Sequence, residues 1–183
     1  MSALPIIQLH RGDFQGSTTS LRGPCERVVD FGAGFQRIVD DLIETLKHHT
    51  IAIGLAAPQV GIQLKLAVIN LSPEKNEPTL VLVNPIITAA TGKKDHKKEM
   101  CMSLPHYCGE VVRRQKLQLS FQNRNGQPET LEAQGFLARV IAHEVDHLEG
   151  MLYIDRMDSL ATLEPVDLFR ESEGGDRTGD PAV

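Results

Sequence analysis

The chain has 183 residues, of which 41% are hydrophobic, and this suits one domain with a real hydrophobic core. Its formal net charge of −5 argues against a nucleic-acid surface as its main function. No apolar run approaches the roughly 20 residues needed to cross a bilayer, and residues 1–13 lack the pattern of a secretory signal. We therefore expect neither a membrane association nor a nucleic-acid partner.

The first half of the chain predicts one helix and two strands. Residues 12–34 are rich in Gly, Ser and Thr and predict an extended arm with turns. Apolar residues then recur at helical spacing over 35–46, which predicts an amphipathic helix ending near His48 and His49. The small residues of 51–61 predict a loop. The apolar runs 64–71 and 79–83 predict strands.

The second half predicts further strands and a second helix. Residues 91–98 are polar and basic and predict a turn region, and Val111, Val112 and 117–121 predict strands. Asn123 to Gly126 predicts a hairpin turn, because Asn-Gly tolerates positive φ. Helical spacing resumes after Gly135.

Helices that flank a block of strands indicate an α+β fold rather than a regular βαβ alternation. We expect a single catalytic domain over 1–170. The polar residues 171–183 predict a disordered C-terminal tail.

The second helix contains the motif HExxH as His143, Glu144 and His147. Residues four apart project from nearly the same side of a helix, so the two imidazoles can bind one metal ion. Glu144 then lies close enough to take a proton from a metal-bound water. The motif predicts metal-assisted hydrolysis, although a solvated helix with two His and two acids is the plain alternative.

A catalytic metal site needs a third protein ligand, and the residues leave three sources open. The zinc-peptidase pattern HExxHxxGxxH fits at Gly150 but fails at Tyr153. A downstream Glu could come from Glu164 or Glu171. The third source is the thiolate of Cys101, which suits Fe²⁺ or Zn²⁺, although a lone Cys is more often a small buried hydrophobe.

Three sequence blocks occur in a fixed order: AIGLAAPQV at 52–60, EMCMSLP at 99–105 and AHEVDHLEG at 142–150. Together they resemble the peptide deformylase family. Flanking segments at 36–45, 83–85 and 152–156 are also similar, so the resemblance covers roughly residues 4–158. It implies a fold in which the HExxH helix sits inside a partly antiparallel sheet of short strands.

The resemblance also implies an activity and a ligand set. The activity is removal of formate from N-formylmethionyl peptides. Cys101 becomes the third metal ligand beside His143 and His147, with Fe²⁺ as the native ion and Zn²⁺, Ni²⁺ or Co²⁺ as substitutes. Gln59 and the backbone N–H of Met102 become the donors to the oxyanion.

These residues suit that chemistry. The metal would lower the pKa of its bound water, hydroxide would attack the formyl carbon, and Glu144 would act first as general base and then as general acid. Asp146 is placed to orient a His or to brace the helix. The residues expected to bind substrate are Ile53, Gly54, Glu99, Met100, Phe136, Arg139 and Val140.

Several residues depart from the family pattern. Ala52, Met100 and Ala142 stand where Gly, Gly and Gln are usual, and Lys97 and Arg139 stand where apolar residues are usual. Arg139 lies one helical turn before His143 and so shares its face. We therefore hypothesise a preference for an anionic N-acyl substrate, against the alternative that Arg139 extends outward to solvent or pairs with Glu99 or another acid and leaves specificity unchanged.

Two other functions remain open from the sequence. One is a zinc metallopeptidase, and the other is a degenerate, non-catalytic metal-binding protein. Intact Glu144 and Gln59 favour catalysis, because a protein that only holds a metal requires neither.

Cys25, Cys101 and Cys108 are an odd set at irregular spacing, which favours a reducing compartment, and we expect the cytoplasm. The sequence fixes no oligomeric state.

Overall fold

The computed structural model describes residues 2–14, 20–49, 51–72 and 78–166. Within them a single antiparallel sheet has the strand order β1-β2-β3-β4-β5, and β6 pairs with β4. The strands are β1 (Gly54–Ala56), β2 (Leu66–Ile69), β3 (Leu80–Cys101), β4 (Leu104–Gln122), β5 (Pro128–Gln134) and β6 (Glu164–Pro165). The α-helices are α1 (Ala33–His48) and α2 (Gly135–Leu148). The α+β fold is as predicted.

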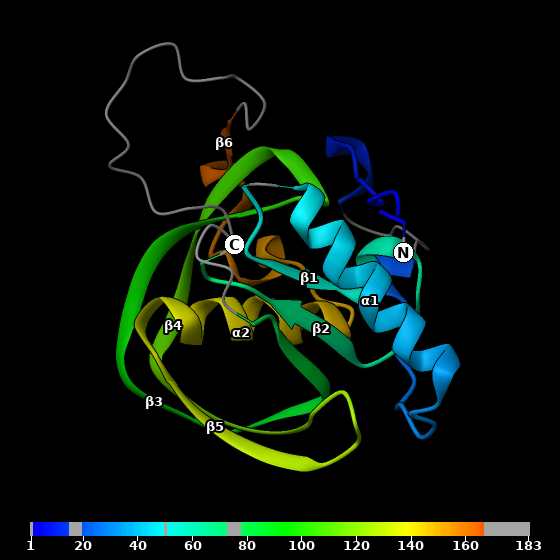
Figure 1. Ribbon diagram of the computed structural model, residues 1–183. Helices are drawn as coiled ribbons and strands as arrows, with labels where there is room; N and C mark the ends of the chain where they lie inside the picture. The colour runs from blue at the N-terminus through cyan, green and yellow to red at the C-terminus, as the bar shows by residue number, and fades with distance from the viewer. Residues whose placement is uncertain (1, 15–19, 50, 73–77, 167–183) are drawn as a thin grey trace.

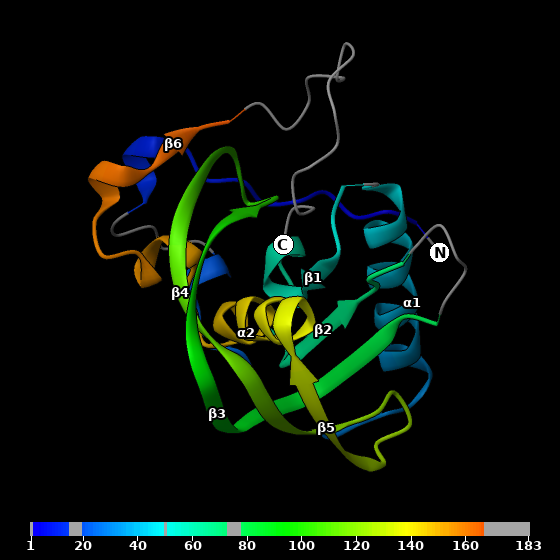
Figure 2. The ribbon, with the colours of Figure 1, turned by 90° about the vertical axis from the view of Figure 1, so that its left-hand side faces the viewer.

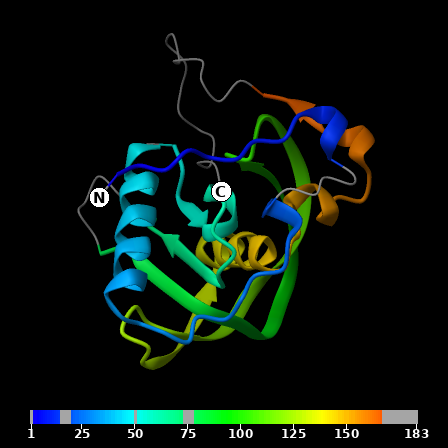
Figure 3. The same ribbon diagram turned by 90° about the vertical axis from the view of Figure 1, so that its right-hand side faces the viewer.

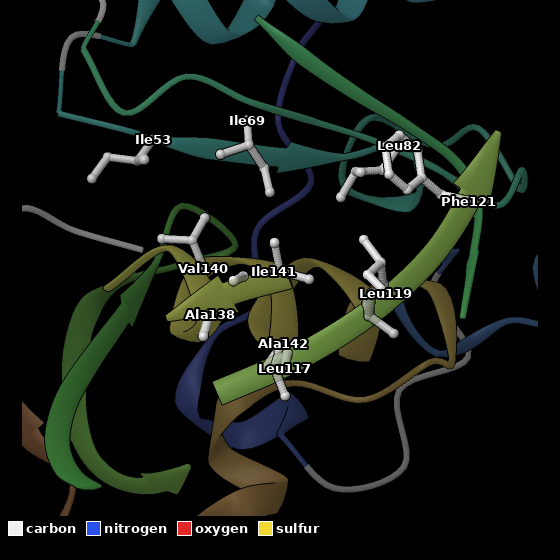
Figure 4. Packing of buried hydrophobic residues seen from close by; sticks show 12 residues of the cluster. Ile53, Ile69, Leu82, Leu117, Leu119, Phe121, Ala138, Val140, Ile141 and Ala142 are labelled. Carbon is white, nitrogen blue, oxygen red and sulfur yellow. The ribbon is translucent and has the colours of Figure 1, made fainter. Parts of the chain in front are cut away.

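Helix α2 lies inside the curve of the sheet (Figure 1, Figure 2). Every residue from Ala138 to Leu148 is buried, as expected for a helix enclosed by the sheet. Figure 4 shows its apolar side chains between two groups of strands. Ile53, Ile69 and Leu82 contribute from the side of β1 to β3, whereas Leu117, Leu119 and Phe121 contribute from β4.

Helix α1 runs along one side of the molecule (Figure 3). Its buried face contains Phe35, Val39, Leu42 and Leu46, and these side chains pack against the other face of β1, β2 and the start of β3. The strands between the two helices are therefore covered on both faces. This double coverage explains why β2 is buried at every position.

The two predicted helices are confirmed, and so is the hairpin turn. Gly126 has φ 80°, and its N–H donates to the carbonyl of Asn123 over 2.9 Å. The predicted loop over 51–61 is wrong in part, because residues 54–56 form β1 and residues 57–60 form a short 3₁₀ helix.

The predicted turn over 91–98 is wrong. These residues belong to β3, which runs unbroken from Leu80 to Cys101 and pairs with β4 through several bulges. All of these residues except the half-buried Asp95 are exposed, so the stretch lacks the apolar–polar alternation that marks a half-buried strand. The expectation of short strands therefore fails for β3 and β4, which span 22 and 19 residues.

The expected tail over 171–183 lies outside the described residues. The last described element is β6, whose Pro165 pairs with Tyr107 of β4. Among the helices of the described ranges, none combines the length and the apolar character required to cross a membrane.

Candidate metal centre

Three candidate ligands meet in the interior. The ligand atoms of Cys101, His143 and His147 all lie within 4.8 Å of one another, and all three residues are buried. The two His share one side of α2, whereas Cys101 ends β3, just after a bulge that breaks the register between Met100 and Cys101. Bulges re-aim side chains. Here the Cys101 Sγ lies 3.3 Å from the Nε2 of His147.

The chemistry of this donor set suits a divalent transition metal. One thiolate with two imidazoles is a ligand combination that Zn²⁺ and Fe²⁺ accept. Two polar atoms of the same motif, the Oε2 of Glu144 and the Nδ1 of His147, are buried without a hydrogen-bond partner in the described part of the chain. Buried polar atoms normally have partners, and the exceptions include catalytic groups and sites that take an ion or a water.

Glu99 fixes the orientation of His143. Its Oε2 lies 3.0 Å from the Nδ1 of His143. Although burial alone would raise the pKa of Glu99, hydrogen bonds from Arg113 and His143 hold it well below its usual range. An ionised carboxylate only accepts hydrogen bonds, so Nδ1 donates to Glu99 and Nε2 is the ring nitrogen left to bind a metal.

Two guanidinium groups surround the Glu99 carboxylate. Arg113 of β4 donates from Nε to Oε1 over 2.7 Å and from Nη2 to Oε2 over 2.9 Å. Arg139 of α2 donates from Nη1 to Oε1 over 2.6 Å. Arg139 is therefore paired with Glu99, the alternative that the sequence left open, and its charge is already neutralised inside the protein.

Asp146 braces the same helix. Its carboxylate accepts from Arg113 over 2.8 Å and from Arg156 over 2.7 Å. It contacts neither His of the motif in these hydrogen bonds, so its role is to tie α2 to β4. Sequence reasoning did not identify Arg113, which is the hub of this network. Arg113 could have been found only from its inward-facing position on β4, and that position is known only once the strand register is known.

Glu144 is fully enclosed. Burial raises the pKa of its carboxyl to about 7. The carboxyl lies directly against Gly54 of β1, where any Cβ would overlap it. Gly54 was expected to let a substrate approach; in the structure its missing side chain leaves room for the Glu144 carboxyl.

The carboxamide of Gln59 faces the sulfur. Its Oε1 accepts from the backbone N–H of Ala56 over 2.8 Å, which fixes the amide orientation. Its Nε2 then points to Cys101 Sγ at 3.4 Å and Ser103 Oγ at 3.3 Å. The donor group of Gln59 is thus held beside the candidate ligand.

The remaining candidates are more dispersed. Ile53 and Val140 are buried in the core around α2, and Phe136 packs at its edge. Met100 is half-buried on β3, and Met102 is half-buried in the turn between β3 and β4. Ala52 is buried in the core under α1, while Ala142 joins the core around α2. Lys97 is exposed.

The other proposed ligands lie elsewhere. Glu164 of β6 is exposed and forms an ion pair with Lys98 over 2.6 Å. Glu171 lies outside the described residues. Tyr153, at the position of the missing peptidase histidine, stacks on His143 with ring centroids 6.3 Å apart and donates its hydroxyl to the carbonyl of Tyr107. It supports an imidazole rather than replacing one.

Comparisons with known proteins agree on one family. Residues 14–162 match the family model for polypeptide deformylase. A peptide deformylase of Microchaete diplosiphon is 38% identical over 160 residues, covering 87% of this chain and 83% of its own. A peptide deformylase from Synechococcus elongatus, solved with actinonin, has a TM-score of 0.76 and 35% identity, covering 87% of this chain and 81% of its own. One from Thermotoga maritima has a TM-score of 0.74 and 30% identity, covering 86% and 99%.

Proposed function

Since the chain belongs to the polypeptide deformylase family, we propose that Cys101, His143 and His147 hold one metal ion and that Glu144 moves the protons of the reaction. The protein is a metal-dependent hydrolase that removes the formyl group from N-formylmethionyl peptides. The formyl carbon–nitrogen bond is broken with one water, giving formate and a free amino terminus. The observation that carries the assignment of residues is the meeting of one thiol and two imidazoles in the interior.

The metal, when bound, supplies a Lewis acid that makes water a nucleophile near neutral pH. We propose Fe²⁺ as the native ion, with Zn²⁺, Ni²⁺ or Co²⁺ able to replace it. Support comes from the ligand chemistry, because thiolate and imidazole suit these ions better than Mg²⁺ or Ca²⁺.

Glu144 takes the proton from the attacking water and gives it to the leaving amine. Its pKa of about 7, raised by burial, suits both transfers near neutral pH. Its Oε2 has no hydrogen-bond partner within the described ranges, so this atom is available to the reacting groups. A protein that merely stored a metal would gain nothing from such a buried acid.

Gln59 donates to the oxyanion that forms at the formyl carbon, together with the backbone N–H of Met102. Support comes from the bond between Ala56 N–H and Gln59 Oε1, which leaves the NH₂ group directed at the site. A donor held in place before the reaction stabilises developing charge without reorganisation. Gly54, Phe136 and Met100 remain candidates for contact with the peptide.

We also propose that the reaction takes place in the cytoplasm. Cys25, Cys101 and Cys108 are all free thiols in the structure, and one of them lies at the proposed metal site. Thiols are kept reduced in the cytosol, so three unpaired cysteines suit that compartment.

Formate release from a formylmethionyl peptide tests the function. The full chain, loaded anaerobically with Fe²⁺, should release one formate per free amine formed. The matched control is Glu144→Gln, which keeps the shape of the side chain and removes its proton chemistry. Equal rates in both proteins would contradict the role of Glu144, and no formate from the wild type with any of the four metals would contradict the proposed function.

A further inference from the structure

Arg139 connects the two elements that carry the proposed ligands. It belongs to α2, which carries His143 and His147, and its side chain reaches across to both strands of the β3–β4 pair. Its Nη2 donates to the carbonyl of Asp95 on β3 over 2.8 Å, and its Nη1 donates to the carbonyl of Val111 on β4 over 3.0 Å.

The same side chain also holds the residue that orients His143. Its Nη1 lies 2.6 Å from Glu99 Oε1, and the other oxygen of that carboxylate meets His143 Nδ1. Glu99 stands two residues before Cys101 on β3. Arg139 therefore contacts the strand close to the thiol and, through Glu99, contacts one imidazole.

The pairing of Glu99 does not depend on Arg139 alone. Arg113 already neutralises the carboxylate with two hydrogen bonds. The guanidinium of Arg139 is only 3% exposed, so its burial is costly. Glu99 does not need it as a partner, because both of its carboxylate oxygens already accept from Arg113. What Arg139 adds is the pair of bonds to backbone carbonyls on β3 and β4, which Arg113 does not make.

We propose that Arg139 is a positioning residue that sets how the thiol-bearing strand and the imidazole-bearing helix are placed relative to each other, and thereby the affinity for the metal. This inference rests on the proposed metal site. Residues that orient metal ligands from behind typically contribute about 10- to 100-fold in affinity.

The direction in which metal affinity changes distinguishes the placement of the ligands by Arg139 from the effect of its positive charge. Loss of a positive charge near a cation site should by itself strengthen cation binding. Loss of a residue that places the ligands should weaken it. Arg139→Met removes both the charge and the three bonds, whereas Arg139→Lys keeps the charge and a donor but loses the planar fork.

The experiment measures the Co²⁺ and Zn²⁺ dissociation constants of the full chain by competition with a chromophoric chelator. We expect one ion per wild-type chain, about 10- to 100-fold weaker binding by Arg139→Met, and an intermediate constant for Arg139→Lys. The sulfur-to-cobalt absorption band should weaken per bound ion in Arg139→Met. Arg156→Met is the matched control, because Arg156 pairs with Asp146 on the same helix without touching Glu99.

Unchanged or tighter binding by Arg139→Met would overturn the inference. If that variant does not fold, Arg139→Lys decides, and wild-type affinity in it would overturn the inference equally. Equal weakening by Arg156→Met would also overturn it, because the loss of any ion pair to α2 would then suffice. A wild-type chain that binds no ion would instead contradict the proposed metal site itself.

Discussion

The carboxyl group of Glu144 packs against the α-carbon of Gly54, so closely that a side chain at position 54 would occupy the same space. Gly54 belongs to β1 and Glu144 to α2, and the two residues are 90 positions apart in the sequence. The proposed general base therefore packs against a strand position that has room for it only because Gly54 carries no side chain. We therefore propose that Gly54 supports catalysis by leaving room for the Glu144 carboxyl rather than by backbone flexibility.

Gly54→Ala should therefore displace the Glu144 carboxyl while leaving the metal ligands in place. General acid–base catalysis contributes about 10²- to 10⁴-fold, so kcat should fall by about 100-fold or more. Metal content should stay at the wild-type level. Steady-state formate release with metal analysis checks this. Gly34→Ala is the matched control, since a Cβ there meets no atom within 4 Å; wild-type kcat in Gly54→Ala would refute the packing argument.

Glu144 also makes the stability of the metal-free protein depend on pH. Burial raises its folded pKa from 4.5 to about 7, so the folded state binds this proton more tightly. The resulting stability is fully present below pH 4.5 and is lost as pH rises through about 7. Between those limits the loss is about 3 kcal/mol relative to Glu144→Gln. Urea unfolding of both metal-free proteins from pH 4 to pH 8 measures it, and parallel pH profiles would contradict the raised pKa.

The sequence predicts the parts of this site that depend on neighbouring residues, and it does not predict contacts between residues far apart in the chain. The HExxH spacing predicts that His143 and His147 share a helix face, because that geometry is local. Arg139 was expected to face a substrate pocket, yet it is bonded to Glu99. That pairing requires the register of β3 against α2, which no local pattern contains.

The strands show the same division. The run 64–71 is apolar on both faces and predicts β2 correctly. Residues 91–98 were predicted as a turn because they are polar and basic, and in β3 all of them except the half-buried Asp95 are exposed. Their strand conformation comes from pairing with β4, for example Lys94 with Arg114 and Lys98 with Glu110. Tertiary pairing overrides local preference in such segments.

Gln59→Leu should reduce the rate without removing the metal. Loss of one oxyanion donor costs about 2.7–4 kcal/mol of transition-state stabilisation, or about 100- to 1000-fold in kcat. The metal should remain, since Gln59 is not a proposed ligand and contacts Cys101 Sγ through one long hydrogen bond of 3.4 Å. Gln118→Leu, on the exposed face of β4, provides the comparison. A rise in KM with an unchanged kcat would show that Gln59 binds the ground state instead.

Asn84 should affect stability and not catalysis. It is the one non-glycine residue with positive φ in the described part of the chain, at 50°. Its side chain bonds both the N–H and the carbonyl of Val28, at 2.9 and 2.8 Å. Asn84→Ala leaves these backbone groups unpaired and should lower the free energy of unfolding by about 1–3 kcal/mol. Denaturant unfolding checks this. A reduced kcat of Asn84→Ala under conditions in which the variant is fully folded would contradict it.

The central claim is that the sulfur of Cys101 and the imidazoles of His143 and His147 bind one ion. X-ray absorption of the anaerobically iron-loaded protein tests this most directly, with Cys108→Ser as control, because Cys108 is also buried and faces Met100 across the β3–β4 pair. We predict one sulfur and two imidazole nitrogens in the wild type and in Cys108→Ser, and no sulfur in Cys101→Ser. An iron shell of oxygen and nitrogen alone in the wild type would contradict the account.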